Sequence, residues 1–261
     1  MNITFYKYQG TGNDFVMIDN RQYNLPKNDT KTVARLCDRR FGIGADGLIF
    51  LENDESADFK MVYYNADGNQ STMCGNGGRC IVAFANYLNV IEDECRFTAI
   101  DGLHHATITN GIVKLQMQDV TKVEQHTGHL FLDTGSPHHV QIETDLDTLQ
   151  IKDKGAQIRY GEPYGAVGSN VNFVSKINDN SFRVRTYERG VEDETLSCGT
   201  GVTAVAIAMN FQGETDEELI KLQSEGGPLE VSFTREQDSY TNVFLKGPAI
   251  QVFKGVIDWK H

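Results

Sequence analysis

Short stretches in which apolar and polar residues alternate run through most of the chain. This alternation is typical of half-buried β-strands. Asp101-Gly102 and Asn110-Gly111 have the chemistry of hairpin turns and separate short strands between 96 and 118. The other expected strands cover 3–8, 15–19, 48–51, 58–64, 129–133, 170–174 and 182–187, with more up to Trp259 separated by turns at 226–228 and 246–248. The pattern therefore predicts a protein built mostly from short, mainly antiparallel strands.

Two segments break the alternation. Residues 77–88 have an apolar face, and residues 201–211 are apolar all round, which predicts two buried helices. Two further helices are expected at 29–40, which begins with a capping Asp29, and at 145–155. Together, the expected strands and helices predict an α+β fold of two halves. Each half is a mainly antiparallel β-sheet or barrel wrapped around a central helix, and the boundary between the halves lies near 118–128.

The two central helices follow a repeated motif. Cys74-Gly75-Asn76-Gly77 leads into the first, and Cys198-Gly199-Thr200-Gly201 leads into the second. A strand ending in Tyr precedes each motif, Phe59 to Tyr64 and Phe182 to Tyr187, and the second copy carries one extra residue before its cysteine. The chain therefore has the pattern of a diverged duplication that presents one thiol at the start of a helix in each half.

A thiol at that position has a chemical consequence. The first turn of a helix carries free N–H groups and the positive end of the helix dipole, both of which favour the reactive thiolate. The glycines let a ligand approach the backbone closely, so the same turn can hold a carboxylate. Two such turns facing each other across an interdomain cleft would suit a reaction in which one thiol removes a proton from a carbon and the other returns one.

Composition narrows the possible partners. The chain has 261 residues, 39% of them hydrophobic, and a net charge of −12. The negative charge argues against nucleic acid and against an anionic membrane. No basic-then-apolar leader and no long apolar run is present, so a cytoplasmic protein is expected. Five scattered cysteines without a C-x-x-C pair predict free thiols.

Two motifs suggest other chemistry and do not fit it. Gly42-Ile43-Gly44-Ala45-Asp46-Gly47 matches a dinucleotide fingerprint, but a helix precedes it and a strand follows, the reverse of the required order. His138 and His139 are adjacent, so they point to opposite faces of an extended segment, and no metal site is expected. No lysine and phosphate-loop arrangement for pyridoxal phosphate is evident, and no cofactor is expected.

Five segments together resemble the diaminopimelate epimerase family. The resemblance runs in order over essentially the whole chain, and the paired Cys-Gly-x-Gly motifs with Glu-Arg-Gly are its specific part. It rests on Gly10-Thr11-Gly12-Asn13-Asp14-Phe15, Asn65-Ala66-Asp67-Gly68, Met73-Cys74-Gly75-Asn76-Gly77, Glu188-Arg189-Gly190 and Cys198-Gly199-Thr200-Gly201. The resemblance implies a cofactor-independent isomerase of lysine and peptidoglycan-precursor biosynthesis, which interconverts LL- and meso-diaminopimelate and forms homodimers. It also implies that the last strand returns to the first half, giving domains of 1–118 with 249–261 and of 119–248.

The resemblance also implies roles for individual residues. Cys74 and Cys198 would be the acid/base thiols, and His138 and Glu188 would set their protonation. The backbone N–H groups that would hold the reacting carboxylate belong to Gly75, Asn76, Gly199 and Thr200. The side chains that would bind the polar ends of the substrate are those of Asn13, Asn65, Asn170, Glu188 and Arg189.

The chain departs from the family pattern at three places. Ser136 stands where the family often has a substrate-binding Asn, and Gly47 stands where many members have Gln. The acidic run Glu192-Asp193-Glu194 is one residue longer than usual. These departures affect expected substrate contacts and the approach to Cys198, and they remove no catalytic group.

Three other functions compete with this one. A proline racemase or hydroxyproline epimerase of the same fold would also use two thiols, although Glu188, Arg189 and the asparagines favour a substrate with a polar distal end. A non-catalytic amino-acid-binding protein would keep its affinity after loss of a thiol. A redox sensor would join its two thiols as a disulfide.

Overall fold

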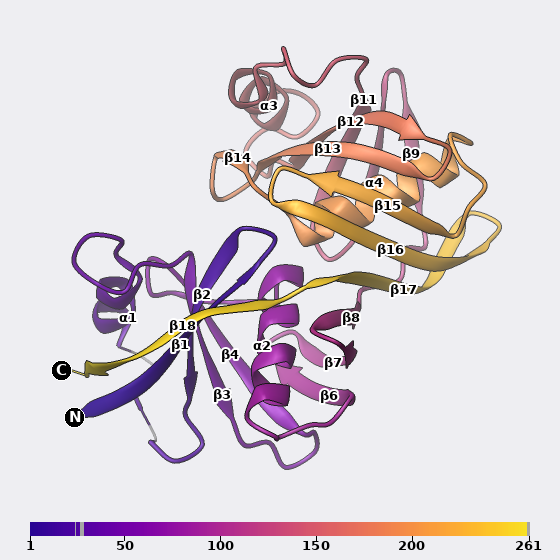
Figure 1. Cartoon of the computed structure of the whole chain (residues 1–261). Coiled ribbons are helices and arrows are strands. Elements are labelled where there is room, and N and C mark those ends of the chain that lie inside the picture. The colour runs from indigo at the N-terminus through magenta and orange to yellow at the C-terminus, as the bar shows by residue number, and fades with distance from the viewer. Residues whose placement is uncertain (24, 27–28, 260–261) are drawn as a thin grey trace. The chain divides into compact units, whose positions relative to one another are not determined.

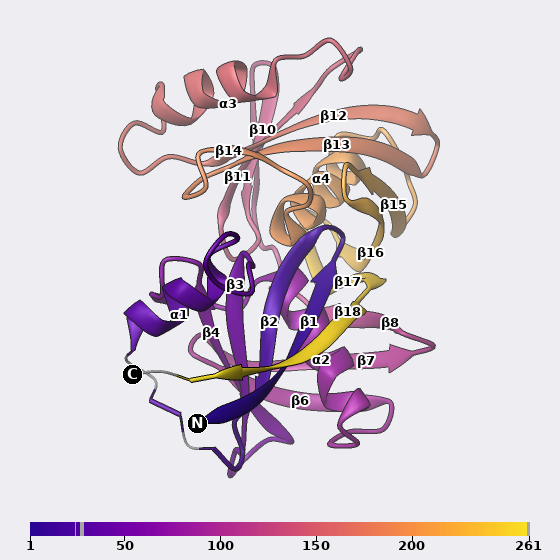
Figure 2. The same ribbon diagram turned by 60° about the vertical axis from the view of Figure 1, so that its left-hand side comes forward.

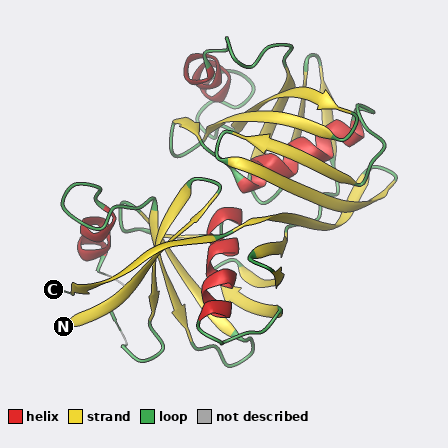
Figure 3. Cartoon of the chain, viewed as in Figure 1, coloured by secondary structure: helices red, strands yellow, loops and turns green. Residues whose placement is uncertain are grey.

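The computed structural model describes residues 1–23, 25–26 and 29–259. The chain divides into two compact units, Met1–Leu115 with Pro248–His261 (unit 1) and Gln116–Gly247 (unit 2). Figure 3 shows that each unit consists mainly of strands, with one long and one short helix. The mixed α+β class expected from the sequence is confirmed. The domain boundaries at 118 and 249 stay a prediction.

Unit 1 contains a mixed sheet in the order β18-β1-β2-β3-β4-β6-β7-β8, with the short β5 on β4 (Figure 1). The pairs β2–β3 and β4–β6 are parallel and the others are antiparallel. Its elements are β1 (Asn2–Gly10), β2 (Asn13–Asp19), α1 (Thr30–Cys37), β3 (Gly47–Glu52), β4 (Phe59–Asn65), β5 (Gln70–Ser71), α2 (Gly75–Tyr87), β6 (Glu94–Ala99), β7 (Gly102–Thr109), β8 (Ile112–Gln116) and β18 (Ile250–Asp258).

Unit 2 repeats this order of strands. Its sheet runs β9-β10-β11-β12-β13-β15-β16-β17 with β14 on β13, and the pairs β11–β12 and β13–β15 are parallel. Its elements are β9 (Val123–His126), β10 (His129–Asp133), β11 (Pro137–Ile142), α3 (Ile151–Tyr160), β12 (Asn170–Asn178), β13 (Ser181–Glu188), β14 (Asp193–Thr195), α4 (Gly199–Phe211), β15 (Leu219–Ser224), β16 (Gly227–Glu236) and β17 (Ser239–Pro248). The duplication seen around the two cysteines therefore extends to the topology of both units.

The helices occupy equivalent places in the two units. α1 and α3 each connect a first parallel pair, and α2 and α4 each connect a second one. In unit 1, α2 packs against β1, β2, β3 and β7; in unit 2, α4 packs against β10, β11, β12, β15 and β16 (Figure 2). Two parallel neighbouring strands need a crossover connection between them. In each unit, the crossover of the second parallel pair contains the central helix that packs on the sheet.

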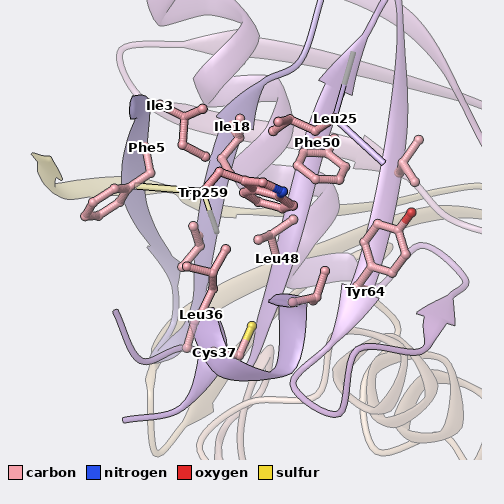
Figure 4. Packing of buried hydrophobic residues seen from close by; sticks show 14 residues of the cluster. Ile3, Phe5, Ile18, Leu25, Leu36, Cys37, Leu48, Phe50, Tyr64 and Trp259 are labelled. Carbon is pink, nitrogen blue, oxygen red and sulfur yellow. The ribbon is translucent and has the colours of Figure 1, made fainter. Parts of the chain in front are cut away.

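Both central helices are built to be buried. Eleven of the thirteen residues of α2 are buried, as are eleven of the thirteen of α4. On the other face of the unit 1 sheet, Trp259 packs with Phe50, Leu48 and Ile18 into a separate core under α1 (Figure 4). Burying each such apolar side chain contributes about 1.5–3 kcal/mol, so each sheet holds its helix by apolar packing.

Two sequence expectations about elements are wrong. The helix expected at 145–155 begins only at Ile151, because Asp145 accepts a hydrogen bond from the Asp147 N–H in a local turn while Leu146 enters the core of unit 2. Gly155 consequently lies inside the helix, where a Cβ would come within 2.4 Å of Tyr187.

The turn expected at 246–248 is also wrong. Those residues continue β17, whose hairpin with β16 turns instead at Gln237-Asp238. Gln237 has a φ of 59°, a left-handed conformation that the alternation of apolar residues does not reveal.

Candidate active site

Three candidate positions of unit 1 lie at one edge of its sheet. Asn13 and Gly47 begin the parallel strands β2 and β3, and Asn65 ends β4, which runs antiparallel to β3. Gly47 is directly paired with Asn65. The strand directions therefore bring these three chain-distant positions to the same edge.

Asn13 is held on both sides of its amide. Its Nδ2 donates to Asp46 Oδ2 at 2.6 Å, and its Oδ1 accepts from Asn76 Nδ2 at 3.4 Å. The second bond links the sheet edge to the first turn of α2. The orientation of Asn13 is thus fixed by Asp46, a residue that the sequence analysis did not select.

Cys74 is the N-cap residue of α2. Its Sγ accepts a hydrogen bond from the Gly77 N–H at 3.2 Å, and the residue is only half-buried. The N–H groups of Gly75 and Asn76 belong to the first turn, which has no intrahelical acceptors for them. A donated N–H and the helix dipole both favour the charged form of the thiol. The predicted thiol at a helix start is confirmed for this half.

Gly47 stands in a place where no side chain fits. A Cβ there would lie 2.6 Å from the Tyr63 ring and 2.5 Å from the Tyr64 carbonyl oxygen. The ring of Tyr63 on β4 occupies the space that a side chain at position 47 would need.

The equivalent edge of unit 2 carries the other candidates. β11 and β12 run parallel, with His138 paired to Asn170, and β13 ends beside them at Glu188. Asn170 Nδ2 donates to Ser136 Oγ at 2.6 Å, and Asn170 Oδ1 accepts from the Arg189 N–H at 2.9 Å. Ser136, Asn170 and Arg189 therefore form one hydrogen-bonded group.

His138 is fully buried and neutral near pH 7. Burial, with a smaller effect from Arg189, lowers the pKa of His138 to about 3. Its Nδ1 lies 3.1 Å from Asn172 Nδ2, which can only donate, so Nδ1 is the acceptor and Nε2 carries the proton. Nε2 has no protein partner among the described residues. His138 can therefore donate one hydrogen bond, and it is no cation at neutral pH.

Cys198 is the N-cap residue of α4 and is 7% exposed. Its Sγ lies 3.4 Å from Thr200 Oγ1, and within the part of the chain that the structure describes α4 offers its sulfur no backbone cap bond. Thr134 Oγ1 donates to the Thr200 carbonyl at 2.9 Å and fixes the first turn. The predicted thiol at a helix start is confirmed here too, in a different environment.

Glu188 and Arg189 lie where β13 ends. Glu188 Oε2 accepts from Thr195 Oγ1 at 3.0 Å, and one Arg189 nitrogen donates to the Val167 carbonyl at 3.2 Å. The acidic run that follows is held by both α3 and β13, because Glu192 pairs with Arg159 of α3 at 3.2 Å and Asp193 is the ladder partner of Glu188. Glu192 of this longer acidic run is thus part of a structural ion pair.

Sequence reasoning missed four polar residues at these two edges. Asn172 follows Asn170 by two positions on β12, so strand alternation places both on one face, and this signal was available. The others carry no comparable local signal; they are Asp46, Arg79 and Thr134. Each acts through a partner far along the chain, which a local pattern does not identify.

No helix of the described ranges is long and apolar enough to cross a membrane. Within those same ranges, three or more His, Cys, Asp or Glu residues nowhere gather in a way that would hold a metal ion.

Known proteins match both the sequence and the fold. The family model for diaminopimelate epimerase matches twice, at residues 5–129 and 130–252. The diaminopimelate epimerase of Flavobacterium psychrophilum is 62% identical over 97% of this chain and 99% of its own length. That of Chlorobaculum tepidum is 41% identical over 95% of this chain and 98% of its own length.

Two solved structures with low sequence identity share the fold. A Bacillus anthracis protein of the phenazine biosynthesis PhzF family gives a TM-score of 0.80 at 11% identity, covering 99% of both chains. A hydroxyproline epimerase from Agrobacterium vitis gives 0.68 at 15%, covering 98% of this chain and 92% of the other. The repeated model match and the high identity over nearly the full length decide the family: this chain belongs to the diaminopimelate epimerases.

Proposed function

We propose that the protein is a cofactor-independent isomerase that interconverts LL- and meso-diaminopimelate in lysine and peptidoglycan-precursor biosynthesis. The observation that carries the proposal is the pair of cysteines, each capping a buried thirteen-residue helix, in a member of this family. One thiolate removes the α-proton, and the other thiol delivers a proton to the opposite face of the carbon.

The carbanion formed on proton loss needs electrostatic stabilisation. The N–H groups of Gly75, Asn76, Gly199 and Thr200 are the proposed donors to the reacting carboxylate. One well-placed donor to a developing anion contributes about 2.7–4 kcal/mol, so several together supply a substantial part of the roughly 8–23 kcal/mol by which enzymes lower barriers.

The remaining candidates are proposed to bind the polar ends of the substrate. Asn13, Asn65 and Asn170 offer amides, Arg189 offers a guanidinium to a carboxylate, and Glu188 offers a carboxylate to an ammonium group. His138 is proposed to donate from its protonated Nε2 to a substrate oxygen or to a thiolate. This role follows from the neutral, buried state of His138 and differs from the role of a positively charged imidazolium.

The test is proton NMR of LL-diaminopimelate in deuterated buffer with reduced protein and no pyridoxal phosphate. We expect the α-proton signal to decline as the meso isomer appears. Cys95→Ala is the matched control, because Cys95 is a buried thiol on β6 whose pKa burial raises to about 12. Proline and hydroxyproline are offered in parallel; exchange of either one, with diaminopimelate inert, would reject the proposed substrate.

Substrate binding without exchange would favour the amino-acid-binding alternative instead. A disulfide between Cys74 and Cys198 formed under mild peroxide, with no exchange activity before oxidation, would favour the sensor alternative.

We also propose that the enzyme is a cytoplasmic homodimer that binds neither nucleic acid nor membranes. The net charge of −12 supports the absence of polyanionic partners. Light scattering tests the assembly: a mass near twice the 29.1 kDa of one chain is expected, and a mass of one chain at micromolar concentration would contradict it.

A further inference from the structure

Arg79 is a fully buried arginine in the second turn of α2. Its two terminal nitrogens donate to the Gly75 carbonyl at 3.1 Å, to Asn76 Oδ1 at 3.1 Å and to Thr11 Oγ1 at 3.0 Å. Nε donates to the Pro248 carbonyl at 3.4 Å. Across the described residues all of its hydrogen-bond partners are neutral oxygens, and no carboxylate lies within ion-pair distance.

A buried charge of this kind is costly unless an anion balances it. Burial lowers the pKa of Arg79, while Cys80 and Cys74 raise it. A guanidinium nonetheless stays protonated in proteins. Cys80 is completely buried, and burial raises its thiol pKa so far that it stays neutral. Cys74 is only half-buried and lies at the helix N-terminus, so it is the thiol of this pair that can ionise.

Unit 2 shows that the backbone alone does not require a cation here. Arg79 is five residues after Cys74, and Thr203 is five residues after Cys198. Thr203 is also fully buried, and its Oγ1 donates to the Gly199 carbonyl at 2.9 Å, the equivalent of the Arg79 bond to Gly75. A neutral hydroxyl is thus sufficient to satisfy this carbonyl, so the charge of Arg79 serves some other purpose.

We propose that Arg79 is a positioning residue for Cys74: its guanidinium fixes the first turn of α2, and its buried charge stabilises the Cys74 thiolate. Through Asn76 the same guanidinium also fixes Asn13. The proposal deepens the proposed function, because the importance of the Cys74 thiolate rests on it.

Other titratable groups lie near this turn. Asp14 on β2 is already paired with Lys7 and Arg39 at 2.7 Å. Asp101 accepts from the Met73 N–H at 3.2 Å and lies 3.5 Å from His104, and its charge opposes thiolate formation. Tyr8 on β1 has a pKa raised by burial and is neutral. Arg79 is therefore the cation within α2 that can balance the thiolate.

The experiment measures the pH dependence of Cys74 alkylation by iodoacetamide, read by mass spectrometry of the Cys74 peptide in the full-length protein. The wild-type midpoint should lie below the value of about 8.5 for a free thiol. Arg79→Gln should raise the midpoint by at least about one unit, which corresponds to a roughly tenfold slower alkylation below the midpoint. Arg79→Lys, which keeps the charge, should restore most of that shift. Thr203→Val is the matched control and should leave the Cys74 midpoint unchanged.

A folded Arg79→Gln variant with an unshifted midpoint would overturn the proposal and leave Arg79 a structural residue. A wild-type midpoint at or above about 8.5 would also overturn the proposal, because it rejects a stabilised thiolate. The readout does not require epimerisation, so absence of exchange with diaminopimelate, together with a shifted midpoint, would reject the proposed function and keep the role of Arg79.

Discussion

The two cysteine-capped helices have equivalent places in the topology and different electrostatic surroundings. Cys74 is half-buried, accepts the Gly77 N–H at 3.2 Å and is followed five residues later by the buried guanidinium of Arg79. Cys198 is buried and close to the Thr200 hydroxyl, and the residue equivalent to Arg79 is an uncharged threonine. The duplication thus preserved the geometry of a thiol at a helix start, while the residues around it diverged to favour the thiolate more strongly in unit 1.

Under the proposed function, this difference has a chemical use. A proton transfer across a carbon needs one thiol deprotonated and the other protonated at the start. If both sites favoured the same protonation state equally, a large fraction of molecules would begin with two thiolates or two thiols. Unequal surroundings bias the pair toward one productive arrangement.

Substitution of either cysteine should have the greatest effect, and it tests whether both thiols are needed although their surroundings differ. Cys74→Ala and Cys198→Ala should each lower the rate of isomer conversion by about 10²–10⁴-fold, the usual contribution of a general acid or base. The rate of meso formation measured by NMR checks this, with Cys95→Ala as the matched control. A single substitution that leaves the rate within twofold would show that its half contributes no proton transfer.

The second prediction concerns acid stability, which should be limited by unit 2. The ring of His139 is stacked on that of His129, with 4.1 Å between the ring centroids. Burial, with repulsion from His129, lowers the pKa of His139 to about 4. In the unfolded chain this histidine takes up a proton near pH 6.5, whereas in the folded protein it does so only near pH 4. The free energy of unfolding is therefore highest above pH 6.5 and decreases as the pH falls to about 4. The linkage amounts to roughly 3 kcal/mol for His139.

Urea unfolding followed between pH 7 and pH 4 checks this linkage. His139→Gln should make the dependence less steep, leaving the part that comes from buried His138, whereas His105→Gln, at a half-buried histidine of unit 1, should not. Equal slopes for wild type and His139→Gln would remove the histidine stack as the cause.

A third prediction uses the equivalent glycines of the two motifs. A Cβ at Gly201 would lie 2.5 Å from Asn172 Oδ1, whereas one at Gly77 would meet the Cys74 sulfur and the end of Ile49 at 3.2 Å. Gly201→Ala should therefore destabilise the protein by about 1–3 kcal/mol through overpacking, and it should displace the amide that holds His138.

Gly77→Ala should change stability by less than half of that, since flexible side-chain ends can move and alanine favours the helix. Thermal unfolding of both variants checks the pair. The opposite order would show that the first turn of α2 is the tighter one.

The smallest expected effect is selectivity of the thiols in the wild-type protein. At pH 7, iodoacetamide should modify Cys74 about tenfold faster than Cys198, because Cys74 is more exposed and its anion is better stabilised. Peptide mass spectrometry over a time course measures both rates at once. Faster modification of Cys198 would reverse the assignment of the resting thiolate.

The local features of this protein could be predicted from the order of its residues. Glycines, Asn-Gly and Asp-Gly turns and the change of apolar period located most strands and all but one of the helices within a few residues, because these signals depend on neighbours in the chain. The repeated Cys-Gly-x-Gly motif also placed both thiols at helix starts. The local sequence patterns gave a wrong prediction at Asp145, where a turn replaced the expected helix start. They were also wrong at 246–248, where a strand continued through Gly247-Pro248.

Which groups far apart in the chain come into contact could not be predicted in this way and is known from the folded structure. The parallel pairs β2–β3 and β11–β12 bring the starts of their strands to one edge in each unit, and alternation does not distinguish a parallel pair from an antiparallel one. The partners of Asn13, His138 and Cys74 depend on these pairings, and so does the burial of Arg79. The physical reason is that hydrogen bonding and desolvation act between atoms close in space, whereas a sequence pattern records only which residues are close along the chain.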